Sequence, residues 1–192
     1  MLISIKTNFS TKMLDPYKII EKYYPKDTDI YFILKIHSEQ VCEKALQIAD
    51  KHPDLKLDKQ FLFEASMLHD IGIFMCDAPR IHCRGTHQYI EHGYLGAEIL
   101  RAEGLPQHAL VCERHTGTGL TKDTILKNKL NIPAQDYFPQ SLEEQVICYA
   151  DKFFSKTKLA EPHSLDQIRK GLAKFGTYQV AMFDTWNARF CC

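Results

Sequence analysis

The sequence predicts an all-α helical bundle, and three observations support that fold class. Apolar residues recur at the three- and four-residue spacing of amphipathic helices over most of the chain. Capping residues precede these stretches, and glycine or proline follows several of them. The chain contains no strand-rich region, internal repeat or low-complexity tract. Its 192 residues, of which 45% are hydrophobic, predict one globular domain that is large enough to enclose a site.

The domain is expected to begin close to the N-terminus. Residues 1–14 are interpreted as an N-terminal extension in which disorder is left open, and residues 15–192 as a single domain whose last helix covers the outside of the bundle. Met13 lies within the extension, so it is an alternative to Met1 as the start of translation.

The individual helices are predicted from their caps and their periodicity. Asp15, Thr28 and Asp58 precede apolar stretches, and their side-chain oxygens can accept hydrogen bonds from first-turn amides. Ser141 and Glu144 have the spacing of a capping box. The expected helices run from Pro16 to about Tyr24, from Asp29 to about Lys51, from Asp58 to Phe74, from Glu91 to Glu103, from Pro106 to about His115, from Ser141 to about Phe154, and from Ser164 to Trp186 with an interruption at Gly176.

Polar residues lie on several of the predicted core stripes, where they cost free energy unless something compensates them. Each has an ordinary explanation alone, such as a hydrogen-bonded core histidine, but the set as a whole does not. Imidazole nitrogens and carboxylate oxygens suit first-row divalent ions, and four histidines with two carboxylates suffice for two ions that share one carboxylate. The six residues are His37, His69, Asp70, His92, His115 and Asp151.

The run from Met67 to Gly72, with its His-Asp-Ile-Gly core, resembles the signature of the HD superfamily of metal-dependent phosphohydrolases. The similarity spans about Ile36 to Lys158. Its other pieces are Ile-His-Ser-Glu-Gln-Val around His37, His92-Gly93 followed by Gly96-Ala97, Arg114-His115-Thr116-Gly117, and Tyr149-Ala150-Asp151-Lys152.

This resemblance implies an HD-domain bundle whose ligands converge on a central metal cavity. It implies that His37, His69, Asp70 and Asp151 hold one ion, that Asp70, His92 and His115 hold the second, and that Asp70 and His69 are catalytic. Iron is the expected metal, with Mn, Zn, Ni, Co and Mg as alternatives. Two such ions can activate water and stabilise charge on a phosphate. We therefore expect hydrolysis of a phosphoester or phosphoanhydride in a nucleotide or another small phosphorylated metabolite.

One position departs from the family pattern. Relatives that cleave nucleoside polyphosphates often carry a lysine three positions after the paired aspartate, where this chain has Ile73. Other groups are therefore expected to bind the substrate, because guanidinium and ammonium groups grip phosphate oxygens and glycine lets backbone amides approach an anion. The candidates are Arg84 as first choice, then Arg80, Lys122, Lys152, Thr116 and Gly117; a solvated surface charge is the alternative for Arg84.

Two other functions remain open at this point. A di-iron oxygenase would use the same ligand types, and a non-catalytic signalling or binding HD domain is a further alternative. A zinc site made by Cys76, His82, Cys83 and His87 is conceivable, although its spacing matches no familiar pattern.

Composition limits the partners. The net charge is zero, and no apolar run approaches the roughly 20 residues of a membrane span. The seven cysteines lack any Cys-x-x-Cys pair, which is typical of reduced thiols. We expect a cytoplasmic protein that binds a small phosphate substrate, with no nucleic-acid polymer and no membrane as partner; a homodimer is left open.

Overall fold

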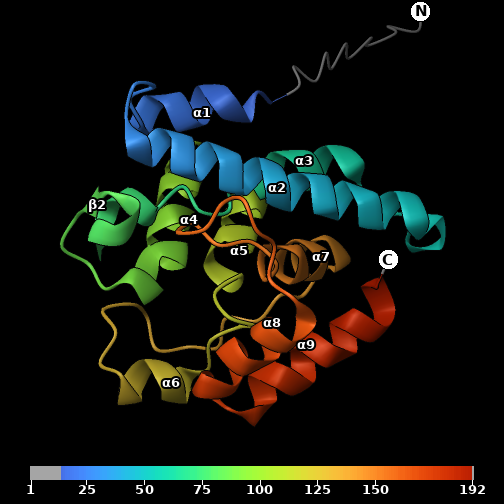
Figure 1. The fold of residues 1–192 in the computed structure, drawn as a ribbon. Coiled ribbons are helices and arrows are strands. Elements are labelled where there is room, and N and C mark those ends of the chain that lie inside the picture. The colour runs from blue at the N-terminus through green and yellow to red at the C-terminus, as the bar shows by residue number, and fades with distance from the viewer. Residues whose placement is uncertain (1–13, 192) are drawn as a thin grey trace, which may run out of the picture.

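The computed structural model describes residues 14–191, so almost all of the expected N-terminal extension lies outside the described residues. Within that range the prediction of an all-α bundle is confirmed (Figure 1). The helices are α1 (Pro16–Tyr23), α2 (Asp29–Lys51), α3 (Lys59–Leu68), α4 (His92–Ala102), α5 (Pro106–Arg114), α6 (Lys122–Lys127), α7 (Leu142–Asp151), α8 (Leu165–Leu172) and α9 (Thr177–Phe190).

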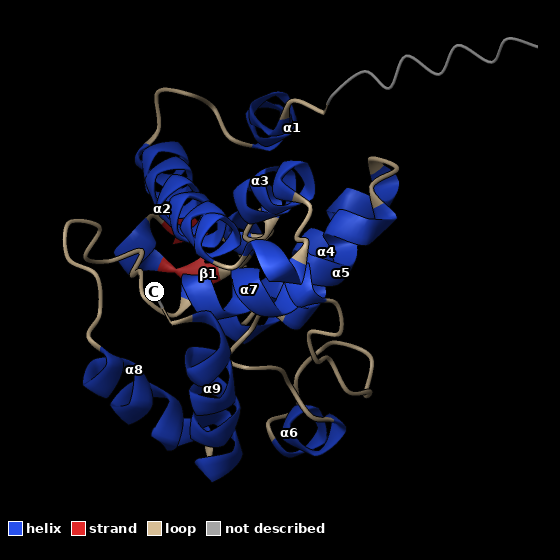
Figure 2. Ribbon diagram, turned by 90° about the vertical axis from the view of Figure 1, so that its right-hand side faces the viewer, coloured by secondary structure: helices blue, strands red, loops and turns tan. Residues whose placement is uncertain are grey.

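The loop between α3 and α4 contains the strands of the described range. β1 (Asp77–Ala78) pairs antiparallel with β2 (Cys83–Arg84), with Asp77 opposite Arg84 and Ala78 opposite Cys83. Figure 2 shows this small ribbon beside the helices, which make up most of the fold.

The core has two main parts that meet along α2, the longest helix. One part packs α2, α3 and α7 against α8 and α9, and its largest buried side chains include Tyr149, Phe183 and Phe190. The other part packs α1, α3, α4 and α5 against the first half of α2. In residues 14–191, the structure contains no helix with the length and apolar character needed to cross a membrane.

The expected caps are present. The side chains of Asp15, Thr28 and Asp58 accept hydrogen bonds from first-turn amides of α1, α2 and α3. Ser141 and Glu144 form both hydrogen bonds of a capping box at the start of α7. These local interactions explain why the helix starts could be predicted to within a residue or two.

The ends of α3 and α7 differ from the prediction. α3 ends at Leu68 rather than Phe74, because residues 69–72 form a turn in which the Ile73 amide donates to the Asp70 carbonyl at 3.1 Å. α7 ends at Asp151 rather than near Phe154. In both cases apolar residues continue beyond the helix, which concealed the end from periodicity.

The predicted C-terminal helix is two helices. Gly176 has φ of 122°, a conformation that side-chain-bearing residues rarely adopt, and it separates α8 from α9. α9 then continues to Phe190, beyond the expected end at Trp186, and packs against α7.

Candidate metal centre

The six polar residues that were predicted to lie on core stripes are all buried and converge in the bundle interior. Five segments bring them together, and four of these segments contribute the residues at helix ends, where the backbone can turn a side chain toward the centre. They are His37 within α2, His69 and Asp70 directly after α3, His92 at the start of α4, His115 directly after α5 and Asp151 at the end of α7.

The first ligand group contains two histidines and two carboxylates. Asp70 Oδ2 lies 3.1 Å from the Nε2 atoms of both His37 and His69. Asp151 Oδ1 lies 3.0 Å from His37 Nε2 and 3.5 Å from His69 Nε2. These four side chains therefore offer ligand atoms around one point.

The second group uses the other oxygen of the same aspartate. Asp70 Oδ1 lies 3.2 Å from His92 Nε2 and 3.3 Å from His115 Nε2, and the two histidine nitrogens are 3.0 Å apart. Asp70 thus presents one oxygen to each group, which is the arrangement that a bridging carboxylate requires.

Backbone carbonyls fix the orientation of three of the imidazoles. In each case Nδ1 lies close to the carbonyl three residues earlier: 2.6 Å for His69, 2.5 Å for His92 and 2.7 Å for His115. A carbonyl can only accept, so Nδ1 carries a proton and Nε2 is the nitrogen that faces the cluster. Metal-binding histidines usually have such a partner on the other nitrogen.

The electrostatics of the cluster favour bound cations. Burial alone would raise the pKa of Asp70, but the nearby charges of Lys156 and His69 hold it well below its usual value. Burial likewise opposes ionisation of Asp151, and Lys152 makes the largest contribution that lowers its pKa. Burial lowers the pKa of His115 to about 4, so this imidazole is neutral and its nitrogen is available to a metal.

The donor set fits divalent metal ions. Asp70 Oδ1 and the Nε2 atoms of His37 and His69 are buried and have no hydrogen-bond partner among the described residues. Leaving buried polar atoms unsatisfied costs about 1–3 kcal/mol each. A metal ion coordinated by these nitrogens and oxygens would remove that cost.

A close approach of two backbones positions the groups. A Cβ atom at Gly72 would lie 2.3 Å from the His92 carbonyl oxygen and 2.4 Å from the Gly96 amide nitrogen. The lack of a side chain at Gly72 therefore allows the turn that carries Asp70 to contact the start of α4, where His92 begins the second group.

A cleft of about 790 Å³ opens onto the cluster. His92, His115 and Asp151 form part of its lining, together with residues of α6, the 173–175 segment and α9. Of the predicted substrate-binding residues, Lys152, Thr116 and Gly117 line this cleft, whereas Arg80, Arg84 and Lys122 are exposed and lie outside its lining. This placement does not favour the expected phosphate contacts of those three residues.

Several cleft residues were not anticipated from the sequence. Lys156 follows α7 in an irregular turn, and its ammonium lies 2.5 Å from Asp70 Oδ2. Lys127, Lys174 and Phe175 come from segments that are far away in sequence. Periodicity carries no signal for such positions, because none of them lies on a buried helical stripe.

Gln179 of α9 was also missed, and it holds the loop after His115. Its Oε1 accepts from the Thr118 amide at 2.6 Å and from the Thr118 hydroxyl at 2.8 Å, while its Nε2 donates to the Gly119 carbonyl at 2.8 Å. The C-terminal helix therefore shapes one wall of the cleft.

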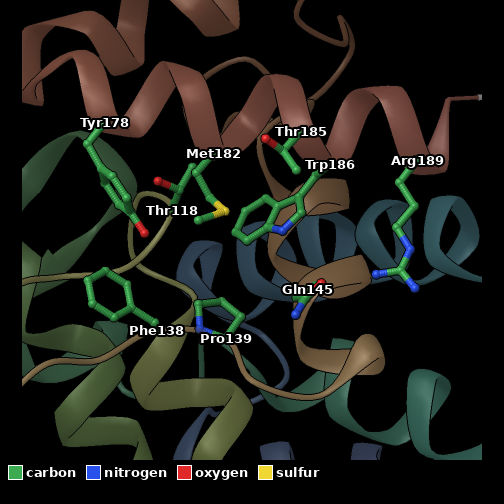
Figure 3. Close-up of a pocket in the computed structure, with 9 residues that line it drawn as sticks. All are labelled: Thr118, Phe138, Pro139, Gln145, Tyr178, Met182, Thr185, Trp186 and Arg189. Atoms are coloured by element: carbon green, nitrogen blue, oxygen red, sulfur yellow. The ribbon is translucent and has the colours of Figure 1, made fainter.

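A second, smaller pocket of about 180 Å³ lies beside α9 (Figure 3). Trp186, Met182 and Tyr178 line it from the helix, opposite Phe138 and Pro139. None of the six candidate ligands contributes to its lining. This pocket is therefore separate from the metal centre.

The alternative zinc site is not assembled in residues 14–191. The groups there whose ligand atoms are close enough to share an ion are the two that meet at Asp70. His82 instead pairs with Asp29 at 3.2 Å, and His87 contacts Glu91 at 3.1 Å.

The chain is similar to several known proteins. An uncharacterized protein of Methanocaldococcus jannaschii is 36% identical over 138 residues, which is 71% of each chain. A tRNA (cytidine(56)-2'-O)-methyltransferase of Picrophilus torridus is 30% identical over 148 residues, or 72% of this chain, which spans only 39% of that relative's length. The crystal structure of the L. monocytogenes phosphodiesterase PgpH HD domain in complex with cyclic-di-AMP has a TM-score of 0.52 at 18% identity, covering 92% of this chain and 96% of that one. The family model described as HD domain matches residues 34–155, which include all six candidate ligands. The chain belongs to the HD domain family.

Proposed function

We propose that this protein is a metal-dependent phosphohydrolase that cleaves a phosphoester or phosphoanhydride bond. The observation that carries the proposal is Asp70, which presents one buried oxygen to each of two ligand groups at the floor of a cleft. A buried carboxylate between two sets of histidines is costly to desolvate in a hydrophobic core, and it suits two neighbouring cations.

Two divalent ions, when bound, would supply a nucleophile from water at neutral pH and stabilise charge that develops on the phosphate. The protein's own part is to hold and orient. Backbone carbonyls fix the imidazoles of His69, His92 and His115 with Nε2 toward the centre. Lys152 donates to the His115 carbonyl at 3.0 Å and pairs with Asp151 at 2.7 Å, so it orients ligands of both groups.

The ligand set narrows the choice of metal. Imidazole with carboxylate suits Fe, Mn, Zn, Co and Ni, whereas Mg²⁺ prefers oxygen ligands and retains water. Four histidines and two carboxylates therefore favour a transition metal, and iron remains our first expectation.

The cleft favours a nucleotide-sized substrate. Its volume of about 790 Å³ falls within the range that small-molecule sites occupy. Lys127, Lys152 and Lys174 supply positive charge for phosphates, and Phe175, 73% exposed at the rim, offers a face on which a base could stack. PgpH, which shares the fold, was crystallised with cyclic-di-AMP, a ligand of the same chemical class.

Phosphate release from nucleotides, cyclic dinucleotides and sugar phosphates, measured without oxygen after metal analysis of the purified protein, tests the proposal. A hydrolase keeps its activity without oxygen, loses it with a chelator and regains it with Fe²⁺ or Mn²⁺. A product that forms only in the presence of oxygen would assign the centre to the oxygenase alternative. If the protein retained its metal but hydrolysed no phosphate compound, the result would favour the alternative of a non-catalytic binding domain.

A further inference from the structure

Lys156 is a cation buried inside the metal centre, although it lies just beyond the segment that matches the HD domain. Its side chain is only 12% exposed, and its ammonium lies 2.5 Å from Asp70 Oδ2. The Tyr89 hydroxyl is a second polar group that interacts electrostatically with this ammonium. Lysine is rarely buried without such partners.

The position of this ammonium conflicts with that of the first ion. Asp70 Oδ2 is the same oxygen that lies 3.1 Å from His37 Nε2 and from His69 Nε2. A divalent ion held by these atoms would share the oxygen with a second positive charge in a site from which water is largely excluded. Two positive charges that contact the same carboxylate oxygen repel each other strongly at low dielectric.

Lys156 can leave, whereas the neighbouring Lys152 is held in place. Lys152 keeps its own carboxylate at Asp151 and a backbone carbonyl at His115. Lys156 has a flexible four-carbon stem that lines the cleft, so its ammonium can turn toward the space that a substrate would enter. A phosphate in that space offers oxygens that replace the carboxylate.

We propose that Lys156 is a phosphate-binding residue whose ammonium competes with the first metal ion for Asp70, so that metal binding releases it to grip the substrate. The inference rests on the proposed function for the identity of the substrate. It gives Lys156 the phosphate-binding role that we expected of Arg84 from the sequence. The ligand class is a phosphate-bearing small molecule, bound through non-bridging oxygens.

Metal titration without substrate tests the competition. Mn²⁺ is titrated calorimetrically into metal-free wild type, Lys156→Met and Lys158→Met. Lys158 is an exposed residue of the same turn and lies outside the cleft lining, so it is the matched control for the lost charge. Lys156→Met should bind the first ion roughly tenfold more tightly or better, and Lys158→Met should match wild type. Equal affinities in all three proteins would overturn the inference.

Phosphate binding tests the second role. With saturating Mn²⁺, inorganic phosphate should bind Lys156→Met roughly tenfold more weakly than wild type, and Lys156→Arg, which keeps the charge, should restore much of the loss. If the methionine variant does not fold, Lys156→Gln, which also removes the charge, replaces it in both titrations. Unchanged phosphate affinity in Lys156→Met would overturn the inference. If both titrations give the expected result but no phosphate compound is hydrolysed, the proposed function fails and the role of Lys156 stands.

Discussion

Gly72 determines how closely the turn after α3 approaches the start of α4. Its φ of −85° is open to any residue, so Gly72→Ala tests space alone and not backbone strain. The added Cβ would lie 2.3 Å from the His92 carbonyl oxygen, against 3.4 Å for an ordinary contact. To restore an ordinary contact, the backbone at Gly72 and the backbone at His92 would have to move apart by about 1.1 Å.

Such overpacking should cost about 3 kcal/mol, the upper end of the usual range, because three backbone atoms, one of His92 and two of Gly96, lie closer to the added Cβ than a normal contact allows. For a domain of this size that corresponds to a decrease in melting temperature of roughly 6–12 °C. His92 would move with its backbone away from Asp70, from which its Nε2 now lies 3.2 Å. Metal sites tolerate errors of only about 0.2 Å, so the second ion should be lost while the first is retained.

Thermal unfolding and metal analysis of Gly72→Ala measure both effects. Gly171→Ala is the matched control, because a Cβ at Gly171 of α8 meets no atom within 4 Å. That substitution should stabilise the protein by about 0.5–1 kcal/mol through helix propensity. If Gly72→Ala melted like Gly171→Ala and kept both ions, the packing argument would be refuted.

Three further predictions concern other parts of the fold. Hydrogen bonds from Lys22, the larger effect, and from Tyr23 lower the pKa of Glu103, so the stability they add is present above about pH 4.5 and is lost as the pH falls. The difference in free energy of unfolding between wild type and Glu103→Gln should therefore shrink on acidification. A difference that grows would contradict this prediction. Gln179→Leu removes three hydrogen bonds to the loop after α5 and should cost about 2–4 kcal/mol in urea denaturation while metal content is retained; wild-type stability would argue against that loop contact. Phe175→Ala should leave the melting temperature unchanged because the ring is 73% exposed, but should raise KM for a nucleotide more than for inorganic pyrophosphate; equal effects would exclude base stacking.

The burial of the six candidate ligands could be predicted from the sequence because each of them breaks a local pattern. Residues such as His37 and Asp151 occupy positions where the helical periodicity predicts an apolar side chain. Both are buried in the structure. Helix starts were predictable for a similar reason, since a capping side chain such as that of Asp58 acts within three residues of its own position.

The cleft could not be predicted in the same way, because its walls come together through tertiary packing. Arg84 is adjacent in sequence to ligand-bearing segments, yet it lies on a surface ribbon outside the cleft lining. Lys174 and Phe175 line the cleft from a segment more than twenty residues after the last candidate ligand, Asp151. Proximity along the chain was a poor guide to proximity in space once no periodic pattern connected the residues.

Metal content of purified Asp70→Ala, compared with wild type and His115→Ala, tests the two-ion centre most directly. Asp70 contributes to both ligand groups and His115 only to the second. Elemental analysis should therefore find two ions in wild type, none in Asp70→Ala, and mainly the first ion in His115→Ala, with each variant shown to be folded by circular dichroism. Asp70→Ala protein that still purified with two ions would contradict the bridging role of Asp70.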